Sequence, residues 1–165
     1  MAGAAFRGTE VVIGYIPGAI GRVAQLHGEY YARHWGFGAF FEGTVAREMA
    51  EFVGSYDERK DRLWLAVQDG VIEGSIAIQG QGSVAHLRWF IVSDRLRGTG
   101  VGSDLVARAT AFCRDSGFPA VDLWTFSGLH AARHLYEKHG FQLAEQREGT
   151  RWGASVTEQR FVLRL

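Results

Sequence analysis

The densest group of chemically useful residues lies within residues 85–106. An apolar run ends at Val92, a turn rich in arginine and glycine follows, and helical spacing resumes after Gly102. Glycines at alternate positions let backbone N–H groups crowd together at a helix N-terminus, where unpaired donors and the helix dipole favour a phosphate. The turn therefore predicts a phosphate site, to which Arg95 and Arg97 would add positive charge.

Two common phosphate-binding patterns fit this turn poorly. A P-loop needs Gly-Lys-Ser or Gly-Lys-Thr at the start of the helix, where this chain has Gly102-Ser103-Asp104. A dinucleotide fingerprint needs glycine at position 103. Its ribose-binding carboxylate would be Asp122, which begins an apolar run and does not follow a strand's carboxyl end. A nucleotide-dependent oxidoreductase is therefore a weak alternative, and a glycine-rich turn that binds nothing is another.

A second motif further along the chain narrows the interpretation. The turn reads Arg97-x-x-Gly100-x-Gly102, and the later segment reads Leu135-Tyr136-Glu137-Lys138-His139-Gly140-Phe141. Together, and in this order, the two motifs resemble those of the GNAT family of N-acetyltransferases. The resemblance covers about Leu63 to Leu165, and it covers the N-terminal part only through the order of the predicted elements.

The length of 165 residues predicts a single domain over residues 1–165. The resemblance implies that this domain uses acetyl-coenzyme A as co-substrate, with no metal. It puts the diphosphate on the main chain of the turn and the pantetheine arm between two splayed parallel strands. The implied cofactor-binding residues are Phe90, Ile91, Val92, Arg97, Gly98, Thr99, Gly100, Val101, Gly102 and Ser103. Many relatives carry an asparagine against the cofactor where this chain has Leu129, so that contact must be absent or replaced, with Ser127, His130 and Arg133 as candidates.

Acetyl transfer to an amine also needs an oxyanion donor, an acid for the leaving thiolate and a base for the ammonium. A backbone N–H near Val92 is the expected oxyanion donor. Tyr136 is the candidate acid, because an unperturbed phenol has a pKa of about 10, close to that of an alkyl thiol, and the family motif gives its tyrosine this role. His86 is the first candidate base, because its even spacing from Val92 puts both on one face of a regular strand. Glu29 is the second candidate, and a water relay without any side-chain base is a third route.

The N-terminal part supplies a candidate acceptor pocket. Helical spacing predicts one helix that buries Ala19, Val23, Leu26 and Tyr30, and a second helix over 41–52. The segment 30–42 between them is too aromatic for a solvated loop, so it either caps the core or lines an acceptor site. The second interpretation agrees with the place of this segment in GNAT proteins and assigns substrate contacts to Tyr31, His34, Trp35, Phe40 and Glu42.

The elements that must position these residues form an α/β (α+β) pattern. Strands are predicted over 11–16, 62–67, 71–78, 87–92, 120–126, 141–146 and 156–163. Asp69-Gly70 predicts a hairpin, and Ser127 is the predicted cap of a helix over 128–139. A strand, helix and strand around Gly102 predict a parallel pair. We therefore expect a mixed, mostly antiparallel sheet with a parallel pair, splayed at the cofactor site, and about four flanking helices.

Composition limits the remaining classes of protein. Lys plus Arg equal Asp plus Glu at 18 each, so no overall field attracts nucleic acid or a membrane. Met1–Glu10 lacks the apolar core of a signal peptide and no stretch approaches membrane-spanning length, so we expect a cytoplasmic protein. Cys113 is predicted to be a core thiol. The expected partner is a small-molecule or peptide amine, with the last strands as a candidate homodimer edge. The alternative is a sensor that binds acyl-coenzyme A without turnover.

Overall fold

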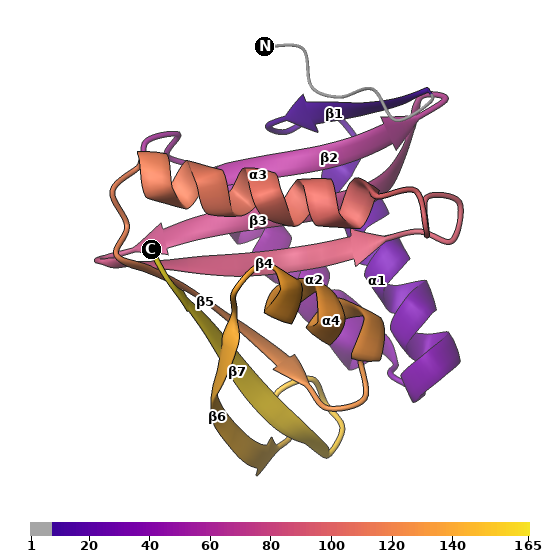
Figure 1. Ribbon diagram of the computed structural model, residues 1–165. Coiled ribbons are helices and arrows are strands. Elements are labelled where there is room, and N and C mark those ends of the chain that lie inside the picture. The colour runs from indigo at the N-terminus through magenta and orange to yellow at the C-terminus, as the bar shows by residue number, and fades with distance from the viewer. Residues whose placement is uncertain (1–7) are drawn as a thin grey trace.

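The computed structural model describes residues 8–165 (Figure 1). Residues 1–7, which belong to the segment expected to lack a signal peptide, lie outside the described residues. Within the described part, a seven-stranded sheet carries four helices, in the chain order β1 (Thr9–Ile13), α1 (Ala19–Trp35), α2 (Ala39–Gly54), β2 (Arg62–Gln68), β3 (Val71–Gln81), β4 (Val84–Val92), α3 (Val101–Asp115), β5 (Ala120–Phe126), α4 (His130–Lys138), β6 (Gln142–Gly149) and β7 (Val156–Arg164). None of these helices is both long and apolar enough to cross a membrane.

The strands are arranged in the order β1-β2-β3-β4-β5-β7-β6. Neighbouring strands are antiparallel except for β4 and β5, which are parallel and are joined through α3. Helices α3 and α4 lie on one face of the sheet, and α1 and α2 lie on the other (Figure 1). The predicted mixed sheet with a parallel pair near its centre is therefore confirmed.

Each face of the sheet has its own apolar core. On one face, Leu105 and Ala109 of α3 are fully buried against the strands. On the other face, Val23 of α1 and Met49 of α2 are fully buried. Burial of such stripes at helical spacing contributes about 25 cal/mol per Å² of apolar surface, which holds the helices on the sheet. The spacing is confirmed for Ala19, Val23 and Leu26 of α1, whereas Tyr30, predicted on the same buried face, is only half-buried.

The Asp69-Gly70 hairpin is also confirmed. These residues have φ angles of 52° and 76°, both left-handed, as a two-residue type I′ turn requires. Gln68 and Val71 pair across the turn, which sets the register of β2 against β3.

The segment between the first two helices differs from the prediction. Helix α1 continues through Trp35 and ends at Gly36, whose φ of 68° suits a left-handed C-cap and whose N–H donates to Ala32 O at 3.1 Å. Helix α2 begins at Ala39, so the connection is only residues 36–38. The aromatic segment expected as a linker over 30–42 is therefore mostly helical, and this decides which of its side chains face the sheet.

Two further boundaries differ for local reasons. Strand β1 ends at Ile13, before a left-handed Gly14 with φ of 92°, and does not reach Ile16. The predicted cap at Ser127 is wrong, because α4 begins at His130 and has no side-chain cap. The backbone N–H of Ser127 instead donates to Thr157 O at 2.9 Å.

Candidate active site

The sheet opens between β4 and β5. Their parallel ladder joins Val84 to Ala120 and ends where His86 pairs with Asp122. Both strands continue beyond this point, to Val92 and Phe126, without pairing to each other. The splayed parallel pair implied by the family resemblance is therefore confirmed.

A β-bulge distorts β4 beside this opening. Ala77 pairs with Arg88, whereas Ser75 pairs with Ile91, so β4 carries one extra residue. Trp89 has a left-handed φ of 49° at the bulge, and its carbonyl accepts a hydrogen bond from Ser75 Oγ at 2.6 Å. The serine thus fixes the backbone at the point where β4 loses its regular alternation.

The bulge overturns one sequence prediction. His86 and Val92 were expected on the same face because of their even spacing in a regular strand. Leu87, next to His86, packs in the α3 cluster, and Val92 packs in that cluster too. The inserted residue reverses the alternation, so His86 faces the α1 and α2 side while Val92 faces α3.

The N–H of Val92 faces the opening. Ser93 N–H donates to Glu73 O at 2.7 Å, on the β3 side of the strand. Because neighbouring N–H groups of a strand point to opposite edges, the N–H of Val92 is directed to the edge of β4 that faces β5. The ladder with β5 has already ended there, which leaves this donor for a ligand.

The turn before α3 has the backbone of an anion cradle. Gly98 and Gly100 have φ angles of 77° and 90°, and Gly100 precedes α3 without a side-chain cap on the helix. A Cβ on Gly102 would lie 3.2 Å from Leu135 Cδ1 and 3.5 Å from Phe90 Cζ. The small residue therefore lets the helix N-terminus sit close to β4 and α4, and its free N–H groups fit a diphosphate.

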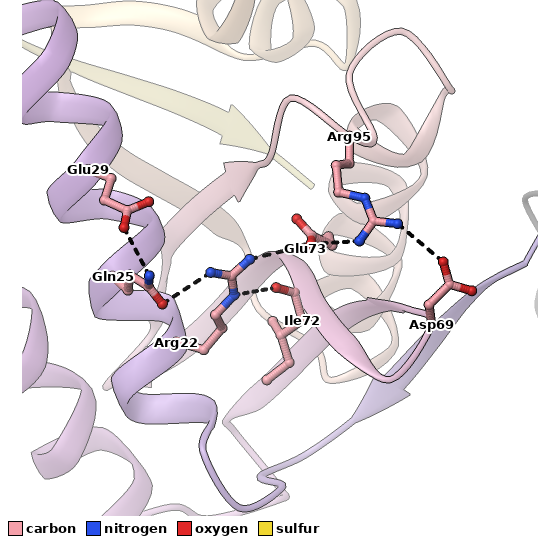
Figure 2. Close-up of polar contacts among 7 residues, drawn as sticks. All are labelled: Arg22, Gln25, Glu29, Asp69, Ile72, Glu73 and Arg95. Atoms are coloured by element: carbon pink, nitrogen blue, oxygen red, sulfur yellow. Dashed lines mark hydrogen bonds and ion pairs between the residues drawn. The ribbon is translucent and has the colours of Figure 1, made fainter.

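The two arginines of the turn have different surroundings. Arg97 lies over the Tyr30 ring, with Cζ 5.7 Å from the ring centroid, and pairs with Asp94 at 3.1 Å. Arg95 instead pairs with Glu73 at 3.3 Å and with Asp69 at 3.2 Å (Figure 2). The expectation that both arginines supply charge to a phosphate stays a prediction, and in the structure each of them is paired with a carboxylate.

A cavity of about 440 Å³ lies at the opening of the sheet. Four predicted site residues line it: Tyr31, His86, Phe90 and Tyr136. Tyr31 packs in the cluster beside α1 and α2, whereas Tyr136 packs in the cluster beside α3. The cavity therefore reaches both faces of the sheet through the gap between β4 and β5.

His86 belongs to a chain of polar contacts in the cavity wall. Its Nδ1–H donates to Asp122 Oδ1, because a carboxylate can only accept. Arg160 Nε donates to Asp122 Oδ2 at 2.9 Å. Burial alone would raise the pKa of the Asp122 carboxyl, but the hydrogen bonds from His86 and Arg160 outweigh burial and lower this pKa. The anionic carboxylate orients the ring of His86, whose other nitrogen, Nε2, lies 3.1 Å from Gln81 Oε1.

Tyr136 is the most enclosed of the predicted catalytic groups, at 6% exposed. Its ring centroid lies 5.9 Å from that of Phe90 and 6.0 Å from that of Phe141. Burial raises the pKa of the Tyr136 phenol above its usual value, and Tyr31 adds to this rise. The phenol is therefore a donor at neutral pH, but its pKa no longer matches that of a thiol as the unperturbed value suggested.

His27 is a second imidazole in the cavity wall, on α1. Its Nδ1–H donates to Val23 O at 2.8 Å, which leaves Nε2 as an acceptor. Burial lowers the pKa of His27 to about 4, against the effect of that hydrogen bond. The ring is therefore neutral at pH 7. Sequence reasoning missed His27, although it lies one turn from both Val23 and Tyr31 on the same helical stripe.

Glu29, His34, Phe40, Trp35 and Glu42 do not line the cavity. Glu29 and His34 lie on the outer face of α1, where Glu29 accepts a hydrogen bond from Gln25 at 2.9 Å (Figure 2). Phe40 is 64% exposed, and Glu42 is also exposed. Trp35 packs edge-on at 4.7 Å behind Phe126, which does line the cavity. The continuation of α1 through Trp35 points Tyr31 towards the cavity and His34 outward, whereas Phe40 and Glu42 occupy exposed positions of α2.

The cavity wall also contains residues that sequence reasoning did not assign. Asp122 was considered only as a ribose ligand, yet it is held by His86 and Arg160, which argues against the oxidoreductase. Trp152, from the loop between β6 and β7, packs against Phe126 with its ring tilted and the two ring centroids 5.3 Å apart. Alignment of the starts of the two parallel strands could have indicated the contact between His86 and Asp122, but no local signal indicates the position of Trp152.

Comparison with known proteins agrees with this architecture. The family model described as the acetyltransferase (GNAT) family matches residues 21–141. No curated protein matches the chain. An acetyltransferase from Streptococcus agalactiae superimposes with a TM-score of 0.74 at 21% identity, over 96% of this chain and 99% of the other.

Two further solved structures have the same fold over nearly their full length. A GNAT acetyltransferase from Staphylococcus aureus gives a TM-score of 0.75 at 14% identity, covering 95% and 99% of the two chains. One from Elizabethkingia anophelis, with acetyl-CoA bound, gives 0.69 at 12% identity, covering 96% and 99%. At such identities the structures establish the fold. The family match spans most of the chain, including both motifs, and so this protein belongs to the GNAT family of acetyltransferases.

Proposed function

We propose that the chain is a single acetyltransferase domain that moves an acetyl group from acetyl-coenzyme A directly to an amine of a small molecule or peptide. The observation that carries this proposal is the cavity through the split sheet. It brings His86 and Tyr136 together beside an unpaired edge of β4. The family supplies the acyl chemistry, and the relative with acetyl-CoA bound supports the choice of co-substrate.

The glycine turn would hold the coenzyme. The N–H groups of Gly102 and Ser103 lie in the first turn of α3, and Gly98 and Gly100 shape the backbone before it. These donors would bind the diphosphate, and Arg97 would add charge at the rim. The edge of β4 beyond His86 would bind the amide groups of the pantetheine arm, because its backbone groups have no partner in β5.

Val92 and Tyr136 would act on the two ends of the breaking bond. The N–H of Val92 would donate to the carbonyl oxygen as the amine attacks and negative charge develops there. Loss of such a donor typically costs about 100- to 1,000-fold in rate. As the carbon–nitrogen bond forms and the carbon–sulfur bond breaks, the Tyr136 hydroxyl would donate its proton to the sulfur. The phenol is protonated at neutral pH and can therefore act as the donor.

His86 would accept the proton of the incoming ammonium. It faces the α1 and α2 side of the sheet, where Tyr31 and Trp152 also line the cavity. Asp122 would act as its positioning residue through Nδ1. This arrangement separates the proton acceptor, on the acceptor side, from the proton donor, on the α4 side. The direct route requires no nucleophilic cysteine, and Cys113 is buried in the α3 core.

The test is release of free thiol from acetyl-coenzyme A with a panel of polyamines, aromatic amines, amino acids, antibiotics and peptides. Tyr136→Phe should lower kcat by about 100-fold or more and leave coenzyme A affinity unchanged. Tyr15→Phe is the matched control, because Tyr15 is exposed and outside the cavity. Unchanged turnover of Tyr136→Phe would remove this residue from the mechanism.

Two further results separate the remaining possibilities. His86→Ala should change the acidic limb of the pH–rate profile, and an unaltered profile would reject His86 in favour of a water relay. Binding of coenzyme A without thiol release for any amine would contradict the enzymatic proposal and favour an acyl-coenzyme A sensor.

A further inference from the structure

A buried carboxylate lies beside the glycine turn but outside the cavity. The side chain of Glu73, on β3, is only 5% exposed and pairs with two arginines (Figure 2). Glu73 Oε1 lies 3.4 Å from Arg22 Nη2 and 3.3 Å from Arg95 Nη1. Arg22 belongs to α1, and Arg95 belongs to the loop between β4 and α3. One carboxylate therefore joins three separate parts of the fold.

Each arginine is also fixed by a second contact. Arg22 Nε donates to Ile72 O at 2.8 Å, and its Nη1 donates to Gln25 at 3.1 Å. Arg95 Nη2 donates to Asp69 at 3.2 Å, at the tip of the hairpin between β2 and β3. The two guanidinium groups are thus held in defined directions by contacts to β3, to α1 and to the hairpin turn.

The same loop contacts α1 at two more places. Arg33 of α1 lies 3.8 Å from Asp94, and Tyr30 of α1 lies under Arg97. The backbone of the loop also begins on Glu73, because Ser93 N–H donates to Glu73 O at 2.7 Å. The loop from Ser93 to Gly100 is therefore anchored on one side by β3 and α1, while its glycines face the start of α3.

Stability alone does not explain a charged group at this position. Removal of a carboxylate from water costs several kcal/mol, which paired charges repay only partly, so a well-packed apolar residue would be as stable. An apolar residue could not hold two guanidinium groups from different elements. The carboxylate therefore serves to position the two guanidinium groups, and through Arg95 it positions the loop between β4 and α3.

We infer that Glu73 is a positioning residue for the coenzyme turn. It holds Arg95, and through Arg95 the loop 93–100, in the conformation that directs the N–H groups of the turn at a diphosphate. Arg95 acts as a strut and does not bind the phosphate. This inference rests on the proposed function, since it concerns the same coenzyme site. Arg22 takes part from α1, although it is outside the loop.

Hydrogen exchange in the free protein tests the position of the loop without any ligand. The N–H groups of Leu96 and Thr99 donate to Ser93 O at 3.1 Å and to Leu96 O at 3.2 Å within the loop. Glu73→Gln and Arg22→Gln should both speed their exchange. Asp61→Asn is the control, because Asp61 is an equally buried carboxylate that accepts from Gly80 N–H at the far end of β3. Equal loop protection in the wild type and both variants would overturn the inference.

Coenzyme A affinity, measured by calorimetry, tests the consequence for binding. Glu73→Gln and Arg95→Gln should each weaken binding by about 2- to 30-fold, while Asp61→Asn should not. The double variant Glu73→Gln/Arg95→Gln should bind coenzyme A no more weakly than the single variant with the lower affinity. Both substitutions break the same ion pair, so their effects should not add. Tighter binding by Glu73→Gln would show that the released Arg95 reaches the phosphate and would overturn the inference.

The remaining outcomes also decide between the proposals. Additive losses for Glu73→Gln and Arg95→Gln would assign Arg95 to the ligand itself and overturn the inference. If Glu73→Gln fails to fold, hydrogen exchange is measured with Arg22→Gln and coenzyme A affinity with Arg95→Gln. Both arginine side chains lie nearer the surface than Glu73. Failure of the wild type to bind coenzyme A would overturn the proposed function, and the exchange measurement would still decide whether Glu73 holds the loop.

Discussion

The buried imidazole of His27 makes the stability of the protein depend on pH. His27 is 6% exposed, and burial lowers its pKa from 6.5 to about 4. Between these two values the unfolded chain binds a proton that the folded chain does not, so stability rises with pH across this window. The contribution of the neutral His27 ring to the free energy of unfolding is therefore fully present above pH 6.5 and is lost as the pH falls towards 4.

The size of the effect follows from the shift. A difference of 2.5 between 6.5 and 4, at 1.36 kcal/mol per unit, corresponds to about 3 kcal/mol. Most of it is lost by pH 4.5. The free energy of unfolding, measured with urea at pH 7.5 and pH 4.5, should therefore fall by about 2–3 kcal/mol more in the wild type than in His27→Gln.

Comparison of the two proteins isolates this residue, because every other titrating group is present in both. His34→Gln is the control, since His34 is exposed on the same helix and water solvates it in both states. It should lose as much stability as the wild type. An equal loss of stability in His27→Gln and the wild type would refute the argument that this ring is buried and neutral.

Three other substitutions or reactions have defined outcomes. Gly128→Ala should lower the free energy of unfolding by about 1–3 kcal/mol, because Gly128 has a φ of 102° and a Cβ there would lie 2.4 Å from the Trp35 ring; an unchanged melting temperature would contradict this. Glu158→Gln should raise the acceptor KM at unchanged coenzyme A affinity, because buried Glu158 accepts from Arg151 N–H at 3.2 Å in the loop that carries Trp152. An unchanged acceptor KM would show that this contact does not position the loop. Burial raises the pKa of Cys113 to about 12, so a thiol reagent at pH 8 should label the protein only in denaturant, and rapid labelling of the native protein would be inconsistent with this burial.

Local chemistry made much of the fold and the coenzyme turn predictable. The hairpin at Asp69-Gly70 and the strand, turn and helix around Gly100 follow from positive-φ preferences and apolar spacing, which act over a few residues. In the structure Gly100 is left-handed, with a φ of 90°, and α3 begins directly after it. The late tyrosine motif placed Tyr136 on a helix, and that helix brings it to the cavity.

The residues on the acceptor side of the cavity were predicted less well, because their roles depend on the direction in which each side chain points. The direction of His34 follows from the point at which α1 ends, and one more helical turn than expected put it outward. The face of His86 depends on the bulge at Trp89, which arises from pairing with β3 and leaves no local pattern. The contact with Asp122 depends on the register of two strands separated by a helix. These side-chain directions and this strand register are set by contacts between distant segments, so the spacing of residues within one segment does not predict them.

The opening between β4 and β5 determines how two ligands can meet. In a continuous sheet the paired strands would separate the two faces, and a ligand bound on one face could not contact a ligand bound on the other. Here Tyr31 and Tyr136 reach one shared space from opposite sides of the sheet. Under the proposed function, the coenzyme and the amine would meet in this space from opposite faces of the sheet. The proposed direct transfer therefore predicts a sequential kinetic scheme, in which a ternary complex precedes the release of either product, and not ping-pong exchange.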